Sequence, residues 1–219
     1  MVDKSSRERV RAITIAPVGL EGVLGLPFDA KGIVLFAHGS GSGRLSPRNN
    51  FVNHALRNNG LATLLFDLLT VEEARDRRNV FDIELLARRL LLATAWVRLD
   101  AETRNLAVGY FGASTGAAAA LVAEAAREGP IAAIVSRGGR PDLAGRALAA
   151  VKAPTLLIVG GDDVEVLALN RAALAKLCCK KQLVIVPGAT HLFEEPGTLE
   201  AVVEHARGWF LKHFTEAEP

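Results

Sequence analysis

The sequence predicts an α/β fold with a mainly parallel, twisted sheet and helices on both of its faces. From residue 30 onward, short apolar runs alternate with longer segments of helical character. The run at residues 32–37 is continuously apolar, which is typical of a strand buried on both faces. The connections are short and contain no linker or repeat, so we expect one domain over residues 1–219.

The expected strands are short runs of apolar and β-branched residues bounded by turn residues. Two of them, at residues 12–17 and 20–27, are expected to pair with each other near the N-terminus. The remaining expected strands lie between helical segments, at residues 32–37, 62–66, 106–111, 131–135, 155–159 and 182–186.

The first helix is expected to begin after Ser46, a favourable N-cap residue that is followed by proline at the first helical position. It should end at Asn59-Gly60, a left-handed stop signal. The next helix, over residues 82–99, carries a leucine-rich apolar stripe. The other expected helical segments are residues 114–127, 141–150, 166–178 and 199–214.

The composition argues against nucleic-acid and membrane partners. The formal net charge is +2, with 26 basic residues scattered among 24 acidic ones, and no basic stripe is present. Residues 1–11 are charged and do not resemble a signal peptide, and the apolar run at 117–126 is too short to span a membrane. The adjacent Cys178 and Cys179 indicate free thiols in a reducing compartment, so we expect a cytoplasmic protein.

The strongest chemical signal is the segment Gly112-Ala113-Ser114-Thr115-Gly116, which follows an expected strand and opens an expected helix. This is the context that a G-x-S-x-G nucleophile elbow requires. The sharp turn holds the serine hydroxyl out at the carboxyl edge of the sheet, and the helix N-terminus offers free N–H groups to an oxyanion. We therefore expect Ser114 to be a nucleophile; the alternative is a glycine-rich turn in which Ser114 only caps the helix.

A serine hydroxyl needs a general base, and His191 is the best placed of the five histidines. It follows the last expected strand and so lies at the same sheet edge as Ser114. We expect His38 to hydrogen-bond neighbouring loop backbone. We expect His213, in the last helical turn, to be solvated, and His54 and His205 to be half-buried or surface side chains on their helices.

The acid that orients the base should lie between serine and histidine in chain order. Asp162 and Asp163 follow the strand at residues 155–159 and compete for this role. Asp162 has Glu165 three residues on, a capping-box pattern, so we assign it the helix cap and assign the acid to Asp163. Asp142 is the next candidate.

Two backbone N–H groups should form the oxyanion hole. Thr115, directly after the nucleophile, is one expected donor, and Ser40 in the glycine-rich loop at residues 38–43 is the other, with Gly41 as the second choice. This loop lacks the Lys-Ser/Thr end of a nucleotide-binding P-loop. The expected substrate-binding residues are Gly41, Arg44 and Arg137. Together with Arg140, the two arginines would favour an anionic substrate. The alternative is that all three arginines are solvated on the surface.

Four segments together resemble the dienelactone-hydrolase-like branch of the α/β-hydrolase superfamily, over about residues 13–214. They read F-A-H-G-S-G-S-G, G-Y-F-G-A-S-T-G, L-L-I-V-G-G-D-D-V and V-P-G-A-T-H-L-F-E-E-P-G. The resemblance implies an eight-stranded α/β-hydrolase fold whose acid follows Gly-Gly-x, which again points to Asp163. True dienelactone hydrolases carry a cysteine at the elbow, so Ser114 favours a serine carboxylesterase. Domains that resemble this one also occur beside phosphoribosyltransferase domains.

The expected activity is hydrolysis of a small carboxylic ester through an acyl-enzyme, without a metal or cofactor. The segment at residues 136–151, where larger relatives place a lid, is short, so we expect a minimal lid, an open site and short acyl chains. A thioesterase, a lactonase or an acyl-peptide hydrolase would use the same triad. A catalytically silent hydrolase-fold binding module is the non-enzyme alternative.

Overall fold

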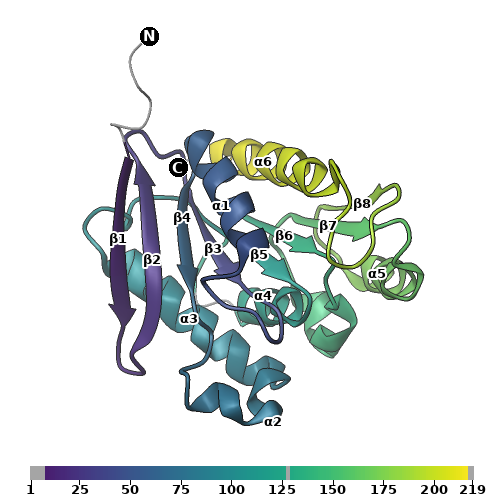
Figure 1. Cartoon of the computed structure of the whole chain (residues 1–219), viewed down its shortest axis with the longest axis horizontal. Coiled ribbons are helices and arrows are strands. Elements are labelled where there is room, and N and C mark those ends of the chain that lie inside the picture. Colours follow the sequence, from purple (N-terminus) through teal and green to yellow (C-terminus); the bar gives the residue numbers. More distant parts are fainter. Residues whose placement is uncertain (1–7, 127–128, 217–219) are drawn as a thin grey trace.

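The computed structural model describes residues 8–126 and 129–216, and an eight-stranded sheet runs through this part of the chain in the order β1-β2-β4-β3-β5-β6-β7-β8 (Figure 1). β2 pairs antiparallel with both β1 and β4, and the other neighbouring strands pair in parallel. The strands are β1 (Glu8–Ile15), β2 (Leu20–Pro27), β3 (Ile33–Ala37), β4 (Ala62–Phe66), β5 (Val108–Ala113), β6 (Ala133–Arg137), β7 (Thr155–Gly160) and β8 (Lys181–Val186). The predicted fold class is confirmed.

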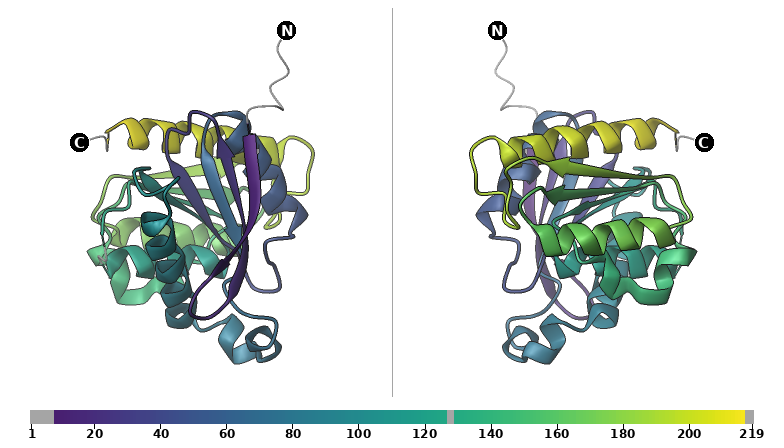
Figure 2. Two further views of the ribbon diagram at one scale, coloured as in Figure 1. Left: turned by 90° about the vertical axis from the view of Figure 1, so that its left-hand side faces the viewer. Right: turned by 90° about the vertical axis from the view of Figure 1, so that its right-hand side faces the viewer.

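Helices cover both faces of the sheet, and each layer has its own apolar core (Figures 1 and 2). On one face lie α1 (Pro47–Asn58) and α6 (Thr198–Glu216), which also contact each other. The other face carries α3 (Ile83–Leu99), α4 (Thr115–Ala125), the 3₁₀ segment η3 (Pro141–Ala150) and α5 (Val164–Lys176). The central strands β3 to β7 are therefore buried on both faces, and the prediction of such burial from the continuous apolar run at residues 32–37 is confirmed for β3.

Local sequence signals account for the ends of the first helix. The Ser46 side chain accepts a hydrogen bond from the backbone N–H of Asn49, and Pro47 occupies the first turn of α1. Gly60, just beyond the helix, has φ +80°, a left-handed conformation that glycine adopts without strain. Both predicted boundaries are confirmed.

The connection between β4 and α3 is the main departure from the predicted elements. No helix or strand is predicted for residues 67–81, yet this segment forms η2 (Glu73–Arg75) and α2 (Arg77–Val80). These elements are too short to give a readable helical period. α2 projects away from the sheet beside α3 (Figure 1). The predicted helix at 114–127 is present as α4, and its residue 127 lies outside the described residues. Among the described residues, no helix has the length and apolar character needed to cross a membrane.

Candidate active site

The carboxyl ends of β5, β7 and β8 bring three predicted site residues to one edge of the sheet. Ser114 directly follows β5, Asp163 lies three residues after β7, and His191 lies in the loop after β8. Ser114 and His191 line the same cavity, which has a volume of about 220 Å³. Parallel strands end at a common edge, so chain order alone placed these residues in one region.

The turn at Ser114 has the strained backbone that a nucleophile elbow needs. Ser114 has φ +50° and ψ −121°, outside the regions that non-glycine residues normally adopt. The flanking glycines leave no room for a side chain: a Cβ on Gly112 would lie 2.5 Å from Cα of Ala117, and one on Gly116 would lie 2.0 Å from the carbonyl oxygen of Ala37. The glycine spacing is thus required by close backbone contacts.

Asp163 and His191 are paired. Asp163 Oδ2 lies 2.7 Å from His191 Nδ1, and the aspartate side chain is 13% exposed. The prediction that Asp162 caps the following helix was wrong, because α5 begins at Val164 and its N-cap is Asp163. The Asp163 side chain makes no capping bond, since its carboxylate is turned to His191. Asp142 instead pairs with Arg140.

The loop that carries His191 is held by its own side chains. Both carboxylate oxygens of Glu195 accept from Thr190, one from the hydroxyl at 2.6 Å and the other from the backbone N–H at 3.1 Å. These bonds hold the pKa of Glu195 below its usual value. Phe193 is buried and has φ +55°, while a Cβ on Gly138 would lie 3.0 Å from the carbonyl oxygen of His191. The histidine therefore sits on a loop that packs closely against the end of β6.

The two predicted oxyanion-hole residues are also in contact. The backbone N–H of Ser40 donates to the side-chain oxygen of Thr115 at 3.1 Å, a bond that joins the loop after β3 to the elbow. Gly39 allows this approach, because a Cβ there would lie 2.9 Å from Cβ of Ser114. Ser40 lines the cavity with Ser114, whereas Gly41, the second choice for this role and an expected substrate-binding residue, lines neighbouring cavities instead.

Arg137, at the end of β6, is a buried cation in the wall of the cavity that Ser114 and His191 line. The residue is 7% exposed, and its guanidinium donates to the side-chain oxygen of Asn49 at 3.2 Å. Its Nε has no hydrogen-bond partner, and no carboxylate among the described residues forms an ion pair with it. Burial, together with the nearby charge of Arg48, lowers the pKa of Arg137 to about 10. The guanidinium lies 6.0 Å from the ring centre of Phe193.

Arg44 lines a cavity that adjoins the one lined by Ser114 and His191 and shares Ser40 and Arg48 with it. Its guanidinium pairs with Asp67 and Glu21, and its backbone N–H donates to Asp67 at 2.7 Å. These carboxylates hold Arg44 against the end of β4, and the cavity it lines contains neither Ser114 nor His191. Arg48 lines the cavity that contains Ser114 and His191. No motif in the sequence distinguishes Arg48 from the other arginines.

Two other histidines have structural partners. His38 Nε2 accepts from the backbone N–H of Leu68 at 2.9 Å, so Nδ1 carries the proton and donates to the carbonyl oxygen of Gly39 at 3.0 Å. Burial lowers the pKa of His38, in keeping with a neutral ring, and the expected bond to loop backbone is confirmed. The expectation that His213 is solvated was wrong: the residue is buried against Trp209 and paired with Glu216, because its face of α6 packs onto the sheet.

Comparison with known proteins places this geometry in a family. No family model matches the chain. The crystal structure of a dienelactone hydrolase from Anabaena variabilis is 56% identical, with a TM-score of 0.90 over 94% of this chain and 98% of that one. Est1E from Butyrivibrio proteoclasticus shares the fold at 16% identity, with a TM-score of 0.76 over 93% of this chain and 99% of that one. Fold and site define an α/β hydrolase.

Within that class, the chain belongs to the dienelactone-hydrolase-like family. Two Mycobacterium tuberculosis proteins are also 56% identical over 217 residues, and both carry the name "Putative phosphoribosyl transferase". The match covers 99% of this chain and 49% of each relative, so the chain spans about half the length of these relatives.

Proposed function

We propose that the chain is a serine hydrolase that cleaves a small carboxylic ester, with Ser114 as nucleophile, His191 as general base and Asp163 as the acid that orients the base. The observation that carries this proposal is the 2.7 Å contact between Asp163 Oδ2 and His191 Nδ1. His191 lines the same cavity as Ser114, whose backbone conformation is strained. The hydrolase and esterase names of the structural neighbours agree with it.

The proposed reaction proceeds through an acyl-enzyme. Ser114 Oγ attacks the ester carbonyl carbon while its proton passes to His191 Nε2. The Nδ1–H of His191 donates to Asp163, which fixes the tautomer and stabilises the imidazolium. The tetrahedral intermediate collapses, and His191 returns the proton to the leaving alcohol. Water, activated by the same histidine, then releases the acid and restores Ser114.

Backbone N–H groups of Thr115 and Ser40 are the proposed oxyanion donors. Thr115 is the first residue of α4, where N–H groups lack partners within the helix and the helix dipole favours negative charge. Ser40 donates to the Thr115 hydroxyl, a bond that holds its N–H at the elbow, and a bound oxyanion would share this donor in a bifurcated, charge-assisted bond. The reaction then uses only side chains, backbone amides and water, so it needs no metal or cofactor.

Arg137 supports an ester that carries an anionic group. A buried guanidinium without a carboxylate partner carries a desolvation cost that a bound carboxylate or phosphate would offset. We expect Arg137→Met to lower kcat/KM for the anion monomethyl succinate by roughly 10- to 100-fold, the range for a hydrogen bond to a charged group. Dimethyl succinate, which is neutral, should change little. Arg171→Met, on the exposed surface of α5, is the matched control. Equal losses for both esters would remove the anion from the proposal.

A thioesterase, a lactonase or an acyl-peptide hydrolase would use the same three residues, and a panel of esters, acyl thioesters and lactones would rank them. We expect the reaction to take place in the cytoplasm. The transferase name of the two curated relatives belongs to proteins about twice as long, and the residues gathered here support hydrolysis.

Reaction with a fluorophosphonate probe tests the central proposal. The wild-type protein should form a stable adduct, with peptide mass spectrometry locating it on Ser114. Ser114→Ala should give no adduct and should lose on the order of 10⁶-fold in kcat, as in triads where the serine has been removed. A folded wild-type protein that does not react would identify a silent binding module.

A further inference from the structure

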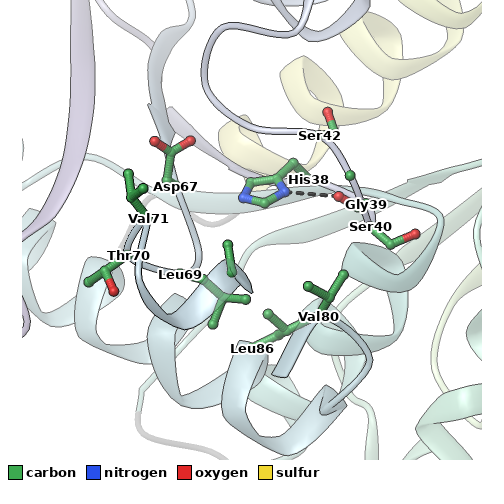
Figure 3. Close-up of a pocket in the computed structure, with 12 residues that line it drawn as sticks. His38, Gly39, Ser40, Ser42, Asp67, Leu69, Thr70, Val71, Val80 and Leu86 are labelled. Carbon is green, nitrogen blue, oxygen red and sulfur yellow. Dashed lines mark hydrogen bonds between the residues drawn. The ribbon is translucent and has the colours of Figure 1, made fainter. Parts of the chain in front are cut away.

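A second cavity, of about 320 Å³, lies between the loop at residues 38–42 and the segment 67–86, which approaches it from the other side (Figure 3). The side chains that face it from this segment are mostly apolar. They are Leu69, Val71, Ala74, Val80 and Leu86. The volume is at the lower end of the range of ligand pockets, which begins near about 300 Å³.

The titratable groups that line this cavity, and the hydroxyl of Thr70, already have partners in the protein. Both ring nitrogens of His38 are hydrogen-bonded to backbone, and burial keeps the ring neutral. The Asp67 carboxylate is paired with Arg44, and the Thr70 hydroxyl accepts from the backbone N–H of Glu73. The cavity therefore offers its occupant an apolar surface with no unpaired charge, which favours a hydrocarbon group.

The second cavity shares a wall with the catalytic cavity. Gly39, Ser40 and Ser42 line both, and Ser40 is the proposed oxyanion donor. When the carbonyl oxygen of an ester is bound at Ser40, either the acyl chain or the alcohol group of that ester can therefore reach this apolar surface. Val71, at 78% exposure, is an apolar side chain of the lining that a bound hydrocarbon group would shield from water.

We propose that this cavity binds the apolar arm of the substrate, so that the preferred substrates are esters with a hydrocarbon group of about six carbons or one aromatic ring. The proposal rests on the proposed ester hydrolysis and names its substrate class. It replaces the sequence-based expectation of short acyl chains, which assumed that only the segment after β6 could supply an apolar wall. Residues 67–86 supply that wall instead.

Three aliphatic esters test the proposal: methyl acetate as reference, hexyl acetate with the long arm on the alcohol, and methyl hexanoate with it on the acid. Hydrolysis is followed by pH-stat, and active enzyme is counted by fluorophosphonate labelling. Each methylene buried is worth about fourfold. At least one six-carbon ester should therefore exceed methyl acetate in kcat/KM by roughly 50-fold or more in the wild-type protein, since this requires only three of its methylenes to be buried.

Ala74→Trp fills the cavity and should reduce that preference, the ratio of kcat/KM for the six-carbon ester to kcat/KM for methyl acetate, to below about fivefold. Glu72→Trp is the matched control, an exposed neighbour outside the lining, and should keep the preference. Val71→Asp, which places a charge in the lining without filling it, should lower the preference in the same direction and serves if Ala74→Trp misfolds.

Two results would overturn the proposal alone: a labelled, active wild-type protein without preference for either six-carbon ester, or a preference that survives both Ala74→Trp and Val71→Asp. A folded protein that neither reacts with the probe nor hydrolyses any ester would overturn the proposed function, and this inference with it.

Discussion

The ends of strands β5, β7 and β8 and the segment between β4 and α3 border neighbouring cavities but are built differently. At the strand ends, backbone packs against backbone: a Cβ on Gly116 would lie 2.0 Å from the carbonyl oxygen of Ala37, and one on Gly160 would lie 2.2 Å from that of Ala189. The segment between β4 and α3 instead contains short helical elements and exposes Val71 and Phe81.

This difference separates the proposed chemistry from the proposed selectivity. Side chains on close-packed strand ends keep a fixed geometry, which bond cleavage requires. Side chains on an exposed connection can be exchanged with little effect on folding, so they can change substrate preference. Substitutions in the first region should therefore affect all substrates alike, and those in the second should affect only large ones.

Among substitutions that test this comparison, the largest effect on kcat is expected at Asp163, in the first region. Asp163→Asn should lower kcat by on the order of 10⁴-fold for every ester, because His191 loses the carboxylate that fixes its tautomer. Asp162→Asn, its exposed neighbour, should be nearly silent, since Asp162 neither caps α5 nor contacts His191. Measuring kcat and the melting temperature of both variants tests which aspartate orients His191. An inactive Asp162→Asn beside an active Asp163→Asn would transfer the acid role.

A smaller effect, on stability, is expected at the elbow. Gly116→Ala should destabilise the protein by about 1–3 kcal/mol, because its Cβ would overlap the backbone at the end of β3. Gly208→Ala, on the exposed side of α6, is the control: no atom lies within 4 Å of its Cβ, so it should stabilise by up to about 1 kcal/mol through helix propensity. Urea unfolding measures both. A neutral Gly116→Ala would contradict the close packing of the elbow.

The smallest of the three effects is expected at Thr115. Thr115→Val removes the hydroxyl that accepts from the Ser40 N–H and should lower kcat by about fivefold, with KM little changed, because the loop after β3 loses a bond worth about 1 kcal/mol. Thr115→Ser keeps the hydroxyl and should restore most of the rate. Equal rates for the valine and serine variants would mean that the bond does not position the loop.

Much of this architecture was readable from local sequence. Apolar runs predicted the order of strands and helices, and Ser46-Pro47 and Gly60 marked the ends of α1 correctly. The segment between β4 and α3 was missed, because a 3₁₀ turn and a four-residue helix have no period to detect. The ion pairs of Arg44 could not be predicted for another reason: nothing in the sequence indicates that Asp67 and Glu21 hold its guanidinium.

The sequence by itself determined the fold class and the elbow, because both depend on short-range rules: hydrophobic period, and glycines two residues before and after Ser114. Tertiary structure alone decided which groups meet. Asp163 reaches His191 across 28 residues, the Ser40 N–H reaches Thr115 across 75, and Arg137 reaches Asn49 across 88. Such contacts depend on how strand ends and loops are oriented at the sheet edge, and packing of the whole chain sets that orientation.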